Sequence, residues 1–457
     1  MRLLEVLSAA LLSTRSNLAS SAHQHQNHRY DASSTDEPVH HHYHRDSFQD
    51  VVISLRPADR HLLESTLADL SDPDGEKYGR FLSREEARAL LQPRQSSVDA
   101  VKRWLAEAGV PEEDVRDGGQ VIEARVSTSD AERLLRLEGL VDGEKESTAA
   151  LRAHVAFVHR APEVRSTSTP QKRFPARRTA SETSQSMLTA RREPPSTTPS
   201  CGGKVTPASL RALYHMDDYT NGNGFAPSQL PAHARSRLGI AGFSGQAAQY
   251  AQLDKFLAAL MPDAVGANFS TALYEHSGEA NLDIQYAVGM AYPVPVTYYA
   301  VGGEDHDFTP DLDIWDPDTQ WVEPYDIFFS YLLDLDDEAL PRVVSISYGV
   351  NEQDVPRAHA QRICDMIGQL GTRGVSVIAS SGDQGPGVSC LSNDGTNTTK
   401  FLPAFPASCP YVTSVGGTHG HGPEVAWNLS SGGFSEYWPR PAWQEMAVGE
   451  YLARLGG

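Results

Sequence analysis

The sequence predicts an α/β fold with a parallel sheet covered by helices on both faces, preceded by a smaller α+β domain. Near-continuous apolar runs alternate with helical patterns over residues 201–457, which is typical of strands buried on both sides. Shorter strand-like runs alternate with amphipathic segments over residues 46–162. A stretch rich in Ser, Thr and Pro at 163–200 lacks hydrophobic periodicity and separates the two, so we interpret it as a linker.

The first 45 residues are expected to precede the folded domains. Residues 1–22 resemble a secretory signal, with one basic residue, a short apolar core and small residues up to Ala22, although Glu5 interrupts the core. Residues 23–45 are rich in histidine. Such tracts can bind metal but imply no fixed geometry, so a disordered segment is the expectation.

The order of elements over 46–162 predicts a split βαβ, ferredoxin-like domain. The strands are expected at 51–55, 120–126 and 153–158, and the helices at 60–70, 97–108 and 129–137. Another helix is expected after Ser83, because the run from Ser83 to Glu86 resembles a capping box.

The larger domain has strands expected at 237–243, 296–301, 342–347 and 375–379, with helices at 250–260, 325–333 and 358–370. In such sheets, ligand sites lie beyond the carboxyl ends of the strands. Two polar loops follow strands there, Ser345–Gly349 and Ala379–Gly385. A candidate site is therefore expected where these loops meet.

Charge and hydropathy exclude some classes of partner. The net charge is −20, and residues 201–457 hold 12 Lys and Arg against 29 Asp and Glu, a net −17. An acidic body argues against nucleic acid and suits a protein that works in acid, where self-repulsion falls. No apolar run reaches the length of a membrane span. The linker is basic, and its pairs of Lys and Arg permit cleavage by another protease, although acid self-processing is equally compatible.

Four cysteines permit two disulfides in three connectivities. Pairing Cys390 with Cys409 closes the shortest plausible loop and is the first expectation, with the others left open. The triplets that begin at Asn268, Asn397 and Asn428 are glycosylation acceptors, which fit a secretory route.

The two acids Glu279 and Asp283 form the first candidate catalytic pair. Helical spacing stacks them on one face, where like charges repel. Apolar residues flank them, so burial and mutual repulsion would push their pKa values apart, as acid–base catalysis requires. The alternative is a solvated surface pair. Asp383 leaves the sheet on a glycine-flanked turn, and its alternative is a turn or N-cap aspartate.

These residues, taken together, resemble the sedolisins, the serine-carboxyl peptidases that include fungal and lysosomal tripeptidyl peptidases. The resemblance rests on Ser381–Gly385, Glu279 with Asp283, and Ser345–Gly349. Further blocks agree with it in the same order: Lys77–Ser83 with the activation-domain signature, Cys201–Tyr214 with the start of the mature enzyme, and Phe405–Thr418 and Ser431–Gln444 with later family blocks.

The resemblance implies a subtilisin-like fold and a serine nucleophile. Glu279 would be the general base, Asp283 would orient it and share its proton, and Asp383 would occupy the oxyanion position. A protonated carboxyl there can donate a hydrogen bond to the developing oxyanion. The implied substrate-binding residues are Ser347, Tyr348, Gly349, Ser381 and Gly382.

The sequence departs from the family pattern at the nucleophile. The family carries it in a Gly-Thr-Ser motif downstream of the block around Phe434, and the 457 residues contain no such motif. Gly417-Thr418-His419 lies before that block and has His in place of Ser. Ca²⁺ is expected for complete family members at a site beyond this sequence. No metal ligands are assigned here, and the acidic loop 304–318 lacks the glycine and terminal glutamate of an EF-hand.

The resemblance thus predicts a secreted, acid-acting peptidase precursor that lacks its C-terminal part and is inactive as given. It would be extracellular, or reside in a vacuolar or lysosome-like compartment, as a monomer with its first domain as intramolecular inhibitor and folding aid. Peptides or proteins would be its substrates, and exopeptidase and endopeptidase action both stay open. The alternative is a non-catalytic pseudo-peptidase that binds peptides. An ordinary subtilisin is disfavoured, because no Asp/His pair occupies the expected strand contexts and Asp383 replaces an asparagine.

Overall fold

The structure, a computed structural model, describes residues 48–135, 151–161, 205–216, 237–271, 278–306, 308–310, 322–420 and 423–455. The chain divides into two units, one of residues 42–164 with 222–457 and another of residues 1–41 with 165–221. In the latter, the described residues contain the helix α7 (Pro207–Leu213). Thr206 caps its N-terminus and forms a capping box with Ser209. The predicted signal, His-rich segment and linker, and Cys201, lie outside the described residues.

The smaller domain is built on a four-stranded antiparallel sheet in the order β2-β3-β1-β4. Its strands are β1 (Phe48–Leu55), β2 (Val115–Asp117), β3 (Val121–Ser127) and β4 (Val155–Arg160). With helices between β1 and β2 and between β3 and β4, this is the ferredoxin-like arrangement that the sequence predicted. We did not predict β2, because three residues of mixed polarity form no hydrophobic run.

Helices of the smaller domain are α2 (His61–Ser71), α3 (Arg84–Ala89), α4 (Gln95–Glu107) and α5 (Thr128–Leu135). The predicted capping box is confirmed, because the Ser83 side chain accepts from the Glu86 N–H and the Glu86 carboxylate accepts from the Ser83 N–H at 2.9 Å. Residues three and four apart on α4, Val98, Val101 and Leu105, are buried in the core of this domain. Burying each such side chain stabilises the fold by about 1.5–3 kcal/mol.

A six-stranded sheet forms the centre of the larger domain, in the order β12-β10-β8-β5-β7-β6, and every neighbouring pair is parallel. The strands are β5 (Leu238–Gly242), β6 (Phe269–Thr271), β7 (Val296–Ala300), β8 (Val343–Ile346), β10 (Ser376–Ser380) and β12 (Val412–Val415). The predicted α/β class is therefore confirmed. The short strands β6 and β12 at the two edges were not predicted.

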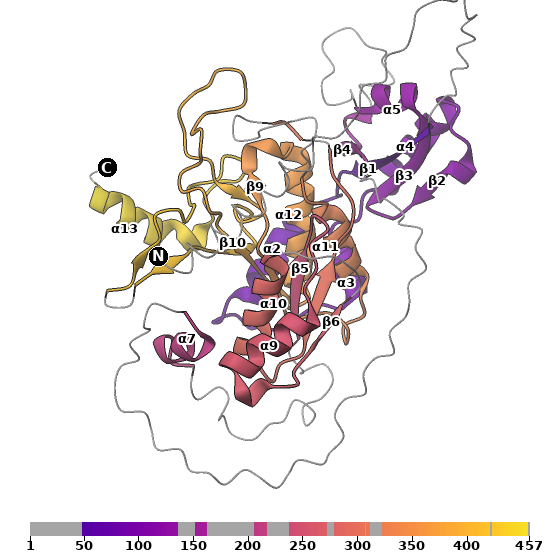
Figure 1. The fold of residues 1–457 in the computed structure, drawn as a ribbon. Helices are drawn as coiled ribbons and strands as arrows, with labels where there is room; N and C mark the ends of the chain where they lie inside the picture. The colour runs from indigo at the N-terminus through magenta and orange to yellow at the C-terminus, as the bar shows by residue number, and fades with distance from the viewer. Residues whose placement is uncertain are drawn as a thin grey trace, which may run out of the picture. The chain divides into compact units, whose positions relative to one another are not determined.

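Helices cover both faces of this sheet, as expected. Ile240 of β5 packs in a cluster with α9 (Tyr250–Leu260) and α10 (Gly278–Ala291), which lie side by side in Figure 1. Its neighbour Ala241 packs in the other cluster, with α11 (Tyr325–Asp334) and α12 (Arg357–Thr372). Successive strand residues point to opposite faces, so the two helix pairs lie on opposite sides.

Shorter elements complete the described chain. They are the paired strands β9 (Val350–Asn351) with β11 (Ala404–Phe405) and β13 (Thr418–His419) with β14 (Val425–Ala426), the 3₁₀ turns at 112–114, 262–264, 352–354 and 442–444, and the helix α13 (Glu445–Leu455). None of the described residues of α13 is buried, and Trp443, Met446 and Leu455 are each at least 65% exposed.

The disulfide differs from the first expectation. Cys409 bonds Cys364 of α12, with a Cα–Cα distance of 5.7 Å, and not Cys390, which is a free thiol. The prediction from the shortest loop was wrong. Cys409 packs in the same core cluster as Cys364, whereas Cys390, in the segment between β10 and β11, does not belong to that cluster.

The smaller domain contacts α12 through α2 and the segment before α3. The Arg60 guanidinium bonds the Asp365 carboxylate at 2.8 Å, the Leu82 N–H donates to the Thr372 carbonyl at 2.8 Å, and the Gln369 amide donates to the Ala87 carbonyl at 2.9 Å. These contacts tie the two domains together. Among the described residues, no helix combines the length and the apolar character that crossing a membrane requires.

Candidate active site

The helix α10 presents the predicted acidic pair. Glu279 lies in its first turn and Asp283 one turn later. Ala280, Ile284 and Val288 occupy the next stripe around the helix and are almost fully buried in the core. The acids therefore lie at the border of a buried face, and both are half-buried.

Burial sets the electrostatics of this pair. Burial raises the pKa of Glu279 to about 7, and the negative charges of Asp283 and Asp383 act in the same direction. Burial also raises the pKa of Asp283 to about 6, opposed by a hydrogen bond from Ser347. At mildly acid pH the pair thus retains protons that ordinary carboxyl groups would lose.

The loop after β8 supplies the hydrogen bond to Asp283. The Ser347 hydroxyl donates to Asp283 Oδ1 at 2.8 Å, while Oδ2 is buried without a hydrogen-bond partner. Tyr348 is buried, with its ring edge-on to Phe243 at 5.4 Å between centroids. At Gly349, a Cβ atom would lie 2.9 Å from a backbone oxygen of the neighbouring β11, so the loop needs glycine there.

The turn after β10 carries Asp383. Ser381 is buried, Gly382 has φ of +105°, and Asp383 is exposed. The Ser431 N–H donates to the Gly382 carbonyl at 3.0 Å, and a Cβ on Gly382 would lie 2.8 Å from the Ser431 Oγ. The negative charge of Asp383 contributes to the raised pKa of Glu279, so this turn lies within electrostatic range of the acidic pair.

The structure therefore brings together Glu279, Asp283 and Ser347 from α10 and the carboxyl end of β8, and Asp383 after β10 acts on Glu279 through its charge. Tyr348 and Ser381 lie in the same two loops but are buried, whereas Gly349 is exposed. Two facing carboxyl groups with raised pKa values can hold one proton between them, which suits proton transfer to and from a hydroxyl nucleophile.

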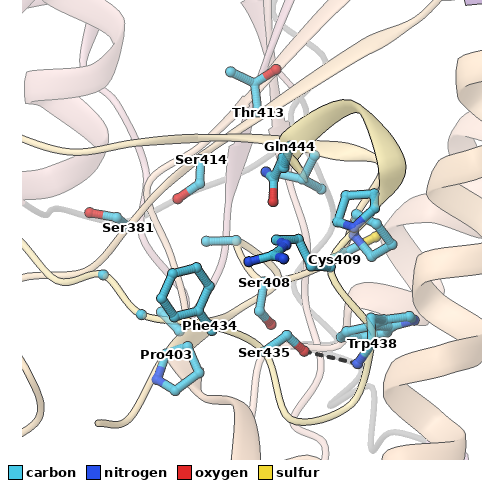
Figure 2. A pocket seen from close by; sticks show the side chains of 18 of the residues that line it. Ser381, Pro403, Ser408, Cys409, Thr413, Ser414, Phe434, Ser435, Trp438 and Gln444 are labelled. Carbon is cyan, nitrogen blue, oxygen red and sulfur yellow. Dashed lines mark hydrogen bonds between the residues drawn. The ribbon is translucent and has the colours of Figure 1, made fainter. Parts of the chain in front are cut away.

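A separate hollow of about 430 Å³ lies next to the β10 turn (Figure 2). It shares Ser381 with the predicted site, but Glu279, Asp283 and Asp383 do not line it. Trp438 and Phe434 line it from the C-terminal block, with Thr413 and Ser414 from β12, as Figure 2 shows.

Ser435, which also lines the hollow, has a structural role. Its hydroxyl donates to the Glu352 carboxylate at 2.6 Å and accepts from the Trp438 N–H at 3.1 Å, the bond drawn in Figure 2. These two hydrogen bonds hold the loop in place.

One cluster of side chains among the described residues could hold a metal ion, and its ligand set does not suit calcium. Among them, the group of at least three close His, Cys, Asp or Glu side chains is His159, Asp326 and His359. Ca²⁺ takes six to eight oxygen ligands, so two imidazoles and one carboxylate do not fit it. Sequence reasoning did not single out this cluster, because its members lie far apart in the chain.

Comparison with known proteins identifies the family. Residues 37–140 match the family described as "Pro-kumamolisin, activation domain". The chain is 38% identical over 420 residues to "Tripeptidyl-peptidase SED2" of Arthroderma otae, covering 86% of this chain and 67% of that protein. This chain belongs to the sedolisin family.

A second curated relative agrees with this sedolisin assignment. "Probable tripeptidyl-peptidase SED2" of Arthroderma benhamiae is 37% identical over 420 residues, with the same coverage. A solved structure, "Pseudomonas sedolisin (serine-carboxyl proteinase) complexed with two molecules of pseudo-iodotyrostatin", has 20% identity and a TM-score of 0.35, and covers 53% of this chain and 66% of that one. A TM-score that low carries no weight alone, so the sequence relatives decide.

The predicted resemblance is thus confirmed. The sedolisin chain spans about two thirds of the length of these curated relatives. It is a serine-type peptidase precursor by family and carries an activation domain. The block Lys77–Ser83, which suggested that domain, contacts the peptidase part, because the Phe81 ring lies against Gly374.

Proposed function

We propose that this protein is the precursor of an acid-acting serine-carboxyl peptidase, with Glu279 as general base, Asp283 as its orienter and Asp383 as the oxyanion donor. The single observation that carries the proposal is the half-buried pair on α10, whose pKa values are raised to about 7 and about 6. A surface pair would not retain its protons at mildly acid pH.

The chemistry follows from the shared proton. Glu279 would take the proton of the attacking serine, while Asp283, held by Ser347, would keep the Glu279 carboxyl in place and share the proton it gains. Asp383, once protonated, would donate a hydrogen bond to the tetrahedral oxyanion. An ionised Asp383 would instead repel that charge, which restricts the reaction to acid.

The substrates would be peptides. The names of the curated relatives favour release of tripeptides from an amino terminus, and endopeptidase action stays the second possibility. Ser347 and Gly349 would pair with the substrate backbone at the end of β8, and Ser381 and Gly382 at the end of β10.

We further propose the domain plan of a secreted, monomeric zymogen: signal at 1–22, His-rich segment at 23–45, activation domain at 46–162, cleavable linker at 163–200 and peptidase domain from 201. The contacts of α2 with α12 support an activation domain that binds its own peptidase. Asn268, Asn397 and Asn428 are exposed, as glycosylation requires.

The nucleophile would come from residues other than these 457, since they hold no Gly-Thr-Ser. The second candidate is a pseudo-peptidase that binds peptides uncut. Reading the transcript past codon 457 separates the two, because an in-frame Gly-Thr-Ser supports the enzyme and a genuine stop supports the binder.

The decisive experiment treats the 457-residue chain and any longer product with a serine-directed fluorophosphonate in acid. We expect labelling and peptide hydrolysis by the longer product alone. Acyl-enzyme formation by the 457-residue chain would contradict the missing nucleophile, and an unlabelled longer product that contains Gly-Thr-Ser would contradict the peptidase.

A further inference from the structure

Two buried histidines meet where the activation domain contacts the peptidase domain. His159 lies on β4, Asp326 in the first turn of α11, and His359 in the first turn of α12. Their potential ligand atoms all lie within 4.8 Å of one another. His159 Nε2 is 3.2 Å from Asp326 Oδ2, and the two imidazoles stack with centroids 4.7 Å apart.

The cluster is short of hydrogen bonds. Each histidine is 1% exposed, and four of the polar atoms are buried without a hydrogen-bond partner: His159 Nδ1, Asp326 Oδ1 and both ring nitrogens of His359. One such orphan costs roughly 1–3 kcal/mol, and buried core histidines are ordinarily satisfied. These unpartnered atoms belong to the three side chains whose ligand atoms lie within 4.8 Å of one another, which indicates a site for a group that supplies their partners.

The surroundings suit a cation held by neutral imidazoles. Asp305, which is 3% exposed, places Oδ2 3.6 Å from His359 Nδ1, as a carboxylate does when it orients an imidazole whose other nitrogen binds a metal. Phe157 stacks on His359 at 5.0 Å, and the Arg362 charge also reaches this ring.

We propose that His159, Asp326 and His359 bind a divalent transition-metal ion, Zn²⁺, that clamps the activation domain onto the peptidase domain. Two imidazoles and a carboxylate are a ligand set that Zn²⁺ accepts and that Ca²⁺ and Mg²⁺ do not. The fourth position is left to water.

Binding requires a small rearrangement. Zn–N bonds of about 2.0–2.1 Å put tetrahedral ligand atoms roughly 3.4 Å apart, so side chains whose ligand atoms now lie within 4.8 Å must move closer on binding. Because β4 supplies one ligand and α11 and α12 the others, the ion would join the domains directly.

The test measures Zn²⁺ binding by isothermal titration to the whole 457-residue chain. The histidines of residues 23–45 are first replaced by glutamine in every arm, since that tract can bind metal itself. We expect one Zn²⁺ per chain, its loss in His159→Gln and His359→Gln, and affinity about 10–100-fold weaker in Asp305→Asn. His61→Gln is the matched control, because its side chain is 91% exposed in the same domain.

X-ray absorption at the zinc edge makes the result independent of how the variants fold. Two imidazoles in the spectrum of the unsubstituted cluster support the proposal. An all-oxygen shell, equal binding by His159→Gln and His61→Gln, or no binding at neutral pH would each overturn it.

Discussion

The Ser347 hydroxyl donates a hydrogen bond to Asp283 Oδ1 at 2.8 Å, across the gap between the end of β8 and the helix α10. The bond anchors one carboxylate oxygen and leaves the other buried. Asp283 is thereby fixed beside Glu279, and a proton can be held on the unanchored side of the pair. Five predictions follow from this arrangement and from the fold around it, the first being the loss of the base.

Glu279→Gln removes the proposed base while keeping its shape. In a longer product that is active, we expect kcat/KM to fall by roughly 10²–10⁴-fold or more, because proton transfer from the serine is lost. Folding should be unaffected, since a neutral amide is easier to bury than a charge. Turnover in acid close to that of the parent enzyme would contradict the role given to Glu279.

Asp283→Asn changes the titration of Glu279 and needs no active enzyme. Removing the Asp283 charge eliminates one cause of the raised pKa, so the Glu279 pKa should fall from about 7 towards its ordinary range. Carbon-detected NMR titration of the side-chain carboxyl in the 457-residue chain measures this. A pKa unchanged by the substitution would show that the two groups do not interact.

The acidic pair should make the fold more stable in acid. A folded-state pKa raised above the unfolded value means that the folded chain binds more protons, so the free energy of unfolding falls as pH rises from about 4 to about 7. Each pKa unit is worth at most about 1.4 kcal/mol, and partial solvent screening reduces it.

Urea unfolding across that pH range measures how the free energy of unfolding changes with pH, and Glu279→Gln should flatten that slope. A slope of the same size in Glu279→Gln would exclude the acidic pair as its source.

Asp326 has the opposite effect on stability, and it does so in a more acidic pH range. Despite burial, which by itself raises its pKa, the His159 hydrogen bond holds that pKa at about 2. The contribution of Asp326 to the free energy of unfolding is present above about pH 4 and is lost as the pH falls towards 2.

Asp383 can be tested by two substitutions that differ only in donor capacity. Asp383→Ala removes the proposed oxyanion donor and should cost about 10²–10³-fold in kcat of an active longer product. Asp383→Asn keeps an N–H donor at every pH, so activity should persist and extend towards neutral pH. Equal losses in both variants, with an unchanged pH profile, would argue against the oxyanion role.

The disulfide between Cys364 and Cys409 should contribute to stability, whereas the free thiol should not. Cys364→Ser opens a loop of 45 residues and is expected to cost about 2–4 kcal/mol of unfolding free energy. Cys390→Ser is the matched control and should change little. Comparable losses in the two variants, measured by denaturant unfolding, would contradict the observed pairing.

Much of the fold was predictable because its signals are local. The helices at 61–71 and 250–260 and the strands β5, β8 and β10 follow from hydrophobic periodicity, and the Ser83 cap follows from four consecutive residues. The strands β2, β6 and β12 were missed, since three or four residues at a sheet edge leave little pattern. Their place depends on the neighbour they pair with.

Sequence by itself determined the α/β class, the family and the helical stacking of Glu279 on Asp283, because spacing along one element fixes which side chains share a face. Only the tertiary structure decided that the Asp383 charge acts on Glu279, that Cys409 bonds Cys364, and that His159 meets Asp326 and His359. Those contacts join separate elements, and the packing of helices on a common sheet, rather than any distance along the chain, sets which of them approach.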